Sequence, residues 1–293
     1  MAQMQQSALK PKKISLITFA VAAGFSMSAW AIDLQPGDAT APPPGLRIIQ
    51  LSYLNAERVG ENNAKLDQTQ VQFRYIQAFE VNQQPALLYL NTGTGKTETA
   101  GALAPYKSDN GMIDTTVVLA YWPYVDRASK TFVAVAGYLI SPTGSYSSDR
   151  VFNMGENRYR WAGQIAYQTR IAPDLDWMSA FDTLWFGKND ASRSLANQLG
   201  TLEQKALYSA QTGLLYHVNQ RYSLAASYFY SEGGETVFKG IAQNNSIKSH
   251  RYQVSAIRNT SIGRFTLQYG QDIDNNASLE EKQRIFLRYT KFF

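Results

Sequence analysis

Cysteine is absent from the sequence, histidine occurs only twice in 293 residues, and no long apolar run follows residue 31. Without cysteine, the chain can hold neither a disulfide framework nor a thiolate metal site. Two separate histidines without clustered carboxylates argue against a histidine metal centre, so we expect no metal and no cofactor. Basic and acidic residues number 28 and 23, and no basic patch with interleaved aromatic residues occurs. Nucleic acid is therefore not an expected partner.

The N-terminal region has the three parts of a secretory signal. Residues 10–13 contain three lysines, residues 14–28 are apolar or small, and Ala29-Trp30-Ala31 fits a cleavage site. The apolar run is shorter than the roughly 20 residues that a membrane-spanning helix needs, which disfavours an uncleaved anchor. We predict a cleaved signal peptide over 1–31 and a mature chain that begins at Ile32. Because the three lysines leave with it and no acidic residue does, the formal charge falls from +5 to +2.

Aromatic residues and period-two alternation dominate the remaining chain. Tyrosine, phenylalanine and tryptophan number 18, 14 and 5, while the mean hydropathy is −0.31. In 221–231, tyrosine, leucine or alanine occupies the even positions and serine recurs at the odd ones, with Phe229 as the exception. Such alternation is typical of a strand with one apolar and one polar face. We predict strands near 46–56, 67–81, 85–91, 112–122, 130–141, 157–170, 174–187, 203–217, 221–231, 247–259, 263–272 and 282–293.

Aromatic residues recur eight positions apart on the apolar faces of several of these strands. At about 3.3 Å per residue and a tilt near 40°, such a spacing rises about 20 Å across a membrane. This approximates the separation of the aromatic girdles of an outer-membrane barrel, whereas a soluble β-sandwich has no reason to repeat it. The predicted girdle residues are Tyr159, Tyr167, Trp177, Trp185, Tyr208, Tyr216, Tyr222 and Tyr230.

The lengths of the connections alternate along the chain. Long gaps follow the odd-numbered strands, at 57–66, 92–111, 142–156, 188–202, 232–246 and 273–281. Shorter gaps follow the even-numbered ones, at 82–84, 123–129, 171–173, 218–220 and 260–262. Long outer loops, short periplasmic turns and periplasmic termini are typical of transmembrane barrels. We predict an all-β fold, a monomeric transmembrane antiparallel β-barrel of about twelve strands over 46–293, in the outer membrane of a Gram-negative bacterium.

Residues 32–45 precede the first strand and include three consecutive prolines at 42–44. Consecutive prolines favour polyproline II, so this segment is neither helix nor ladder. It is either a flexible periplasmic tail or a plug that folds into the lumen, and we favour the tail.

The last predicted strand ends in Phe293, with Ile285, Leu287 and Tyr289 on the same face. A terminal aromatic residue on an alternating strand resembles the assembly signal of outer-membrane barrels, although Lys291 departs from the pattern. We therefore expect the barrel-assembly machinery and outer-membrane lipid as partners.

Short loop motifs carry a resemblance to a known family. They are Gln35-Pro36-Gly37-Asp38 with Pro42-Pro43-Pro44-Gly45, Pro142-Thr143-Gly144-Ser145-Tyr146, and Asn153-Met154-Gly155-Glu156-Asn157-Arg158. The chain resembles the outer-membrane barrels of the phenol-degradation meta-pathway protein family over nearly all of its mature length, with Met154 in place of a commoner leucine. The resemblance implies a barrel that moves small hydrophobic or aromatic compounds across the outer membrane.

One glycine-rich stretch, TGTGKT at 92–97, is superficially similar to a phosphate-binding loop. That motif requires a glycine five positions before its second glycine, where this chain has Leu90. No helical pattern follows the stretch either. We interpret it as a flexible outer loop.

If the apolar strand faces meet lipid, the charged residues of the opposite faces point into the barrel. An outward Arg or Lys near the bilayer midplane would cost about 2–4 kcal/mol. Inside, these charges either brace a filled barrel as ion pairs or form a charged constriction, and Arg158 and Arg160 are the first candidates for a selective element. The predicted lumen-lining residues are Arg74, Arg158, Arg160, Asp176, Asp182, Lys205, Arg251 and Arg264.

These patterns favour a passive outer-membrane channel for small solutes, without enzyme activity. One alternative is a closed structural or surface-interaction barrel. Another is a membrane-embedded hydrolase, which would need His217 or His250 beside a serine and an acid. Ser246 and Ser249 lie near His250 in the sequence.

Overall fold

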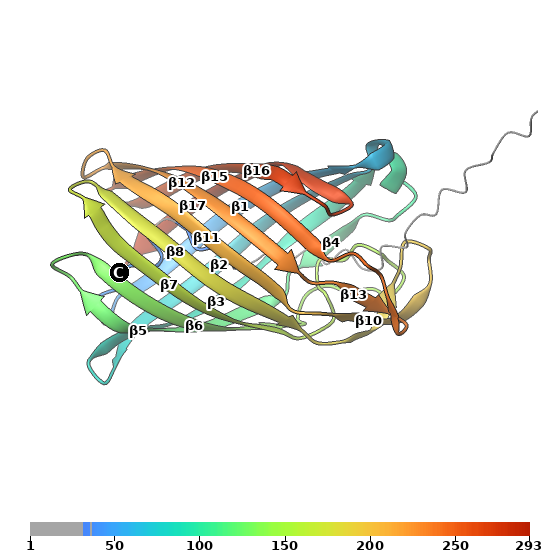
Figure 1. Cartoon of the computed structure of the whole chain (residues 1–293), viewed down its shortest axis with the longest axis horizontal. Coiled ribbons are helices and arrows are strands. Elements are labelled where there is room, and N and C mark those ends of the chain that lie inside the picture. The colour runs from blue at the N-terminus through green and yellow to red at the C-terminus, as the bar shows by residue number, and fades with distance from the viewer. Residues whose placement is uncertain (1–31, 36) are drawn as a thin grey trace, which may run out of the picture.

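The chain folds into a closed β-barrel in the computed structural model, which describes residues 32–35 and 37–293 (Figure 1). β1 pairs with β2 and β17, and β2 also pairs with β3, so the sheet closes on itself. The predicted all-β barrel is confirmed, whereas the predicted signal peptide lies outside the described residues. The barrel strands are β1 (Arg47–Gly60), β2 (Lys65–Val81), β3 (Gln84–Ala100), β5 (Thr115–Asp126), β6 (Thr131–Ser141), β7 (Arg160–Ala172), β8 (Leu175–Phe186), β11 (Leu207–His217), β12 (Tyr222–Gly233), β15 (Ile247–Thr260), β16 (Gly263–Asn275) and β17 (Leu279–Phe292).

One end of the barrel carries the short turns, the start of β1 and the end of β17. The β2–β3 turn uses Asn82 and Gln83 with φ of 50° and 63°, the left-handed geometry that suits a two-residue hairpin. The main-chain groups of Arg47 and Phe293 exchange two hydrogen bonds, at 3.2 and 2.9 Å, where β1 meets the C-terminus. By the usual arrangement of outer-membrane barrels, this is the periplasmic end.

The opposite, outer end carries the remaining elements. A small sheet is formed by β9 (Asn189–Arg193), β10 (Leu199–Gln204), β13 (Thr236–Phe238) and β14 (Ile241–Ala242), and β4 (Asp109–Met112) pairs with β3. Two short 3-10 helices, η1 (Glu61–Asn63) and η2 (Gly101–Leu103), complete it.

Three of the predicted outer loops are wrong because strands continue beyond the membrane. Residues 92–97 belong to β3 and pair with β2, so the glycine-rich stretch is a strand and not a flexible loop. Likewise β1 and β2 leave only residues 61–64 between them, and β16 and β17 leave only 276–278. Beyond the bilayer, the strands stay hydrogen-bonded, but neither face has to be apolar. The alternation of apolar and polar residues is therefore lost there, and the sequence gives no sign of the strand.

The two faces of the barrel differ as the alternation predicts. Outward side chains include Leu51, Trp161 and Leu224, which are 51%, 46% and 53% exposed, whereas Gln164, Ser209 and Gln268 point inward and are buried. Among the described residues, no helix is long and apolar enough to cross a membrane.

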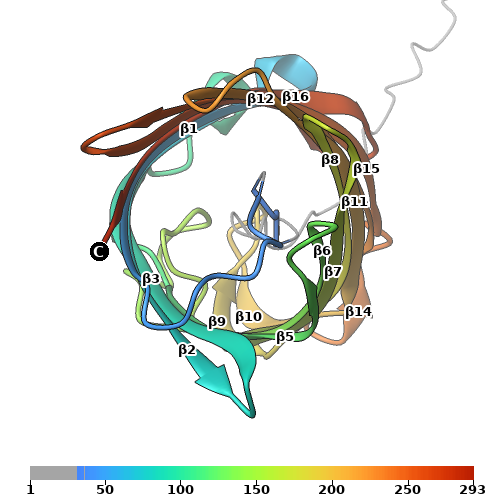
Figure 2. The same ribbon diagram turned by 90° about the vertical axis from the view of Figure 1, so that its left-hand side faces the viewer.

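The segment before β1 lies inside the barrel. Figure 2 looks along the barrel and shows this segment, in blue, within the ring of strands. The indole of Trp122 donates to the carbonyl of Ala39 at 2.9 Å, and the Gln168 amide donates to Thr40 at 2.8 Å. The expectation of a periplasmic tail is therefore corrected. Polar side chains of the wall supply hydrogen-bond partners to the main chain of this segment. In a free tail, only water would supply them.

Candidate functional site: the barrel lumen

A cavity of about 660 Å³ lies in the lumen between the N-terminal segment and the barrel wall. Its wall on β2, β17 and β16 carries the basic side chains of Arg74, Arg288 and Arg264. Tyr89 and Tyr138 add aromatic rings to the lining. The cavity therefore combines cationic and aromatic surface, and Asp33, Asp38 and Asp176 also line it.

Arg74, Arg264 and Arg288 form a cluster that we call the arginine wall. The register places Arg74 opposite Gln50, Arg288 opposite Ser52, and Arg264 opposite Thr290. The three therefore lie within the contiguous run β2-β1-β17-β16, with β1 between the strands of Arg74 and Arg288. Among the described residues, none of the three arginines forms a salt bridge with a carboxylate; Arg288 donates to Ser52 at 3.3 Å and Arg264 to Asn259 at 2.9 Å. The three guanidinium groups have neutral hydrogen-bond or ring partners, and Asp38 of the N-terminal segment, which lines the same cavity, offsets part of their charge.

Aromatic contacts orient the arginine wall. The guanidinium of Arg74 lies 4.5 Å from the ring centroid of Tyr89, and that of Arg288 lies 4.7 Å from the ring of Phe286. Tyr89 and Tyr138 meet edge to face with centroids 6.4 Å apart. Cation–π contacts hold a guanidinium without neutralising its charge. The arginines consequently keep their positive charge at the cavity wall.

The loop over 142–159 carries a buried ion network at the outer end of the barrel. Arg160 contacts Glu156 at 2.6 Å and Asp114 at 3.2 Å, and Arg158 contacts Glu156 at 2.7 Å. Burial raises the pKa of Asp114 and lowers the pKa of Arg158. Arg158 also bonds Gln204 at 2.6 Å. This pairing favours bracing over a free selective charge for the two arginines.

Two of the three loop motifs that carry the family resemblance, 142–146 and 153–158, meet in this network. Gly155 donates its N–H to the carbonyl of Ser145 at 2.8 Å. A side chain at Gly144 would approach the Cα of Gly155 to 2.7 Å, so glycine permits the two strands of the loop to touch. The main-chain N–H groups of Gly144 and Glu156 both donate to the Asp114 carboxylate, at 3.0 and 3.1 Å.

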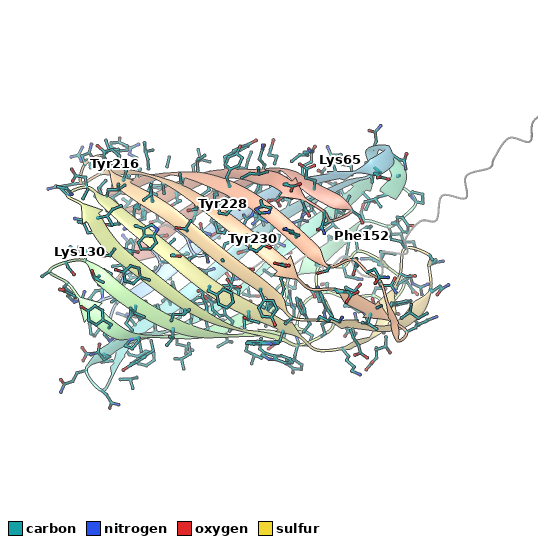
Figure 3. The ribbon with its side chains drawn as sticks, viewed as in Figure 1. Lys65, Lys130, Phe152, Tyr216, Tyr228 and Tyr230 are labelled. Carbon is teal, nitrogen blue, oxygen red and sulfur yellow. The ribbon has the colours of Figure 1, made fainter. Side chains whose placement is uncertain are left out.

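An apolar cluster lies beside the ion network. Phe152 is fully buried and Met154 is 3% exposed, and they pack with Leu66, Leu103, Ile113 and Leu279. Figure 3 shows Phe152 at the outer end of the barrel, away from the short turns. Gly95 leaves room for Met154, since a side chain there would come within 2.8 Å of the Met154 methyl group. The loop is thus fixed by packing as well as by charge.

The other predicted lumen residues fall into two groups. Asp176, Asp182 and Arg251 are buried in the wall, where Asp176 contacts Arg170 at 2.7 Å and Arg251 contacts Asp33 at 2.5 Å. The placement of Lys205 is corrected, because the strand alternation does not reach it. Lys205 precedes β11 at the outer end, where its side chain is 65% exposed and its ammonium pairs with Glu235.

Phe229 and the N-terminal residues are lumen features that the sequence did not reveal. Phe229, the exception to alternation in its strand, is buried, and the Arg251 guanidinium lies 4.2 Å from its ring centroid. An apolar residue at an inward position was the available signal. Asp33 had no such signal, since its segment has no periodicity.

The predicted girdle residues lie on the outer surface. Tyr167 and Trp177 pack edge to face with centroids 5.6 Å apart near the short turns. Figure 3 shows Tyr216 close to the same end and Tyr230 farther toward the outer end. Ile285, Leu287 and Tyr289 also lie on the outer face of β17, and Phe293 is exposed. Their roles at the lipid interface and in assembly stay predictions.

The two histidines occupy different environments. His217 bridges Asp176 at 2.7 Å and Ser223 at 3.3 Å, near the short turns. Ser223 belongs to β12, which pairs on both sides, so the main-chain N–H groups around it serve the ladders rather than an oxyanion. His250 lies beside Tyr228 and Tyr230, with the Tyr230 ring centroid at 5.0 Å. Within the described part of the chain, no group of three potential ligands could hold a metal ion.

The closed sheet, the apolar outer face and the polar lumen define the chain as a β-barrel of the Gram-negative outer membrane. Residues 53–284 match the family described as "Putative MetA-pathway of phenol degradation", and the chain belongs to that family. The predicted resemblance is confirmed. No curated protein matches the sequence.

Solved structures share the barrel fold. The chain is similar to the COG4313 outer membrane channel from Pseudomonas putida F1, at 24% identity and a TM-score of 0.81, over 89% of this chain and 100% of that one. The beta domain of the Bordetella autotransporter BrkA matches at 7% identity and a TM-score of 0.55, over 86% and 100%. The translocator domain of the autotransporter NalP from Neisseria meningitidis matches at 10% identity and a TM-score of 0.51, over 88% and 91%. At these identities the similarity shows the fold.

Proposed function

We propose that the chain is a passive outer-membrane channel for small organic solutes, and that its lumen favours anions with an aromatic ring. The observation that carries the proposal is the cavity of about 660 Å³ lined by the arginine wall and by tyrosines. Its volume lies in the usual range of sites for small organic ligands. The family description and the channel among the similar structures support the same role.

The physical basis for anion preference is an excess of positive charge on the arginine wall, which Asp38 offsets only in part. A low-dielectric wall focuses the field of Arg74, Arg264 and Arg288, which raises the local concentration of anions. Arg side chains bind carboxylates through paired N–H donors, and the faces and edges of nearby rings accommodate an aromatic group. Flux would follow the concentration gradient of the solute.

Two barriers control the path. The N-terminal segment borders the cavity, and the loop over 142–159 packs into the outer mouth. Passage therefore requires one or both to shift relative to the barrel wall.

Planar-bilayer recording tests the proposal. The folded barrel should conduct, and its reversal potential in a salt gradient should show anion preference. Addition of benzoate should reduce the chloride current, while neutral glucose should leave it nearly unchanged. A cation-selective current, or equal effects of the two solutes, would contradict the anion preference.

A closed structural barrel is the second candidate. The observation in its favour is that Phe152 and Met154, on the loop over 142–159, are buried at the outer end. It predicts a folded protein without conductance. A hydrolase predicts ester turnover that disappears in His217→Ala, which we expect not to be observed. Heat-modifiable migration in gels confirms folding before each measurement.

A further inference from the structure

Asp182 is a buried carboxylate without a cation. It lies in β8, its side chain is fully buried, and neither oxygen has a hydrogen-bond partner of adequate geometry among the described residues. No salt bridge reaches it in that part of the chain. A buried carboxylate without a cation is costly, so it is stabilised either by a proton or by a positive group that approaches it.

Within the described part of the chain, Ile32 is the main-chain neighbour of the Asp182 carboxylate. The main-chain nitrogen of Ile32 and the side chain of Gln164 lie beside the Asp182 carboxylate. Gln164 is directly opposite Asp182 in the β7–β8 register. In an unprocessed chain this nitrogen is a neutral amide, which cannot balance the charge.

Ile32 is held in position by other contacts. Its carbonyl accepts hydrogen bonds from Gln164 at 2.8 Å and from Gln211 at 3.2 Å. Its side chain packs against the buried cluster that contains Tyr138, Leu184 and others. The amide of Leu34 donates to Gln211 at 3.0 Å, which fixes the following residues as well.

Asp33 is a second residue that holds the N-terminal segment, next to Ile32. Its carboxylate contacts Arg251 at 2.5 Å and Arg284 at 3.7 Å. The negative charge of Asp33 is thus matched by arginines, whereas that of Asp182 is not. The two acids are therefore distinct in their requirement for a cation.

We propose that the α-ammonium group of Ile32, created by cleavage after Ala31, pairs with Asp182 and locks the N-terminal segment in the lumen. Hydrolysis of the Ala31–Ile32 bond by a signal peptidase consumes one water and leaves a carboxylate on Ala31 and an amine on Ile32. An α-amine of ordinary pKa, about 7.7–8.0, is largely protonated at neutral pH. The proposal rests on the predicted cleavage site and not on the channel function.

The proposed ion pair makes docking of the segment depend on the position of cleavage. One extra residue would displace the ammonium by about 3.5 Å, beyond contact with Asp182 if Ile32 kept its place. The polar contacts of Ile32 would survive in that case, but the carboxylate would again be unmatched. Maturation and docking of the segment are thereby coupled.

The first test is the identity and titration of the N-terminus. Mass spectrometry of the purified barrel should show a chain that begins at Ile32. After ¹³C-methylation, which keeps the charge, the N-terminal amine should titrate at a higher pH in the wild type than in Asp182→Asn. An N-terminus elsewhere, or identical titrations, would overturn the proposal.

The second test measures docking of the segment. Because the chain has no cysteine, Leu34→Cys supplies a single thiol. Its labelling rate should rise about tenfold with Asp182→Asn, and similarly with one glycine inserted before Ile32. Asp176→Asn is the matched control, since Asp176 pairs with Arg170 and should leave labelling near the wild-type rate. Unchanged labelling in both lock variants, in barrels that remain heat-modifiable, would also overturn the proposal.

Discussion

The Nη1 atom of Arg160 lies 2.6 Å from Oε1 of Glu156, and both side chains are buried. The same guanidinium contacts Asp114, so one arginine joins the loop over 142–159 to the segment before β5. Removal of one partner from a buried ion pair typically costs about 3–5 kcal/mol, because the other charge stays uncompensated.

We therefore expect Arg160→Gln to release the loop over 142–159. Protease cleavage within the loop should become faster, and bilayer conductance should increase because the outer mouth opens. Lys188→Gln is the control, since Lys188 forms an exposed pair with Glu203 at the same end. Equal protease resistance of Arg160→Gln and wild type would contradict the bracing role.

Acid should stabilise the docked loop. Burial raises the pKa of Asp114 above its ordinary value, and this outweighs the opposing effect of Arg160. The docked loop binds the proton more tightly than the free loop. Docking is therefore favoured as the pH falls from the pKa of the docked state toward that of the free state, and disfavoured as the pH rises. Conductance should therefore be lower at about pH 4.5 than at about pH 7, and Asp114→Asn should reduce this difference.

Asp149→Asn provides the control for that pH dependence, since Asp149 is 82% exposed on the same loop. The conductance of this variant should depend on pH as that of the wild type does. A current that increases on acidification in the wild type would show that another group governs the loop.

Selectivity should depend on the arginine wall. Arg288→Gln removes a buried cation from the cavity and should lower the anion-to-cation permeability ratio about two- to fivefold, by weakening the local field. Arg258→Gln is the matched control, because Arg258 stacks on Tyr222 at 5.7 Å on the outer face. Reversal potentials in a salt gradient measure both. A similar shift in the two variants would refute a specific role for the lumen arginine.

The Trp122 indole should contribute to stability through the N-terminal segment. Trp122→Phe keeps the ring but leaves the Ala39 carbonyl without its donor, which should lower the free energy of unfolding by about 1–3 kcal/mol. Trp161→Phe, on the lipid face, should cost less. Denaturant unfolding in lipid vesicles compares them, and equal losses would contradict the anchoring contact.

The barrel was predictable because alternation records the environment of each strand face. Trp161 and Ile165 are exposed to the membrane side, and Gln164 between them is buried, as period two requires. The strand ends were less predictable. Thr94 and Lys96 continue β3 beyond the bilayer, where neither side needs to be apolar.

The lumen was predictable only in part. Inward parity placed Arg74 and Arg264 at the cavity, but it could not distinguish their neutral partners from the acidic partners of Arg158 and Arg160. The position of the N-terminal segment in the lumen was not predictable, because contacts such as Trp122–Ala39 and Arg251–Asp33 join residues 83 and 218 positions apart. Such pairings depend on the closed barrel, which no local pattern encodes.

Entry of an aromatic anion into liposomes tests the central claim, that the lumen is a path for solutes, most directly. Vesicles with the folded, processed barrel should take up radiolabelled benzoate down its gradient faster than vesicles without protein, and Arg288→Gln should slow this uptake while Arg258→Gln does not. Uptake no faster than in protein-free vesicles, with a heat-modifiable barrel in the membrane, would contradict the account.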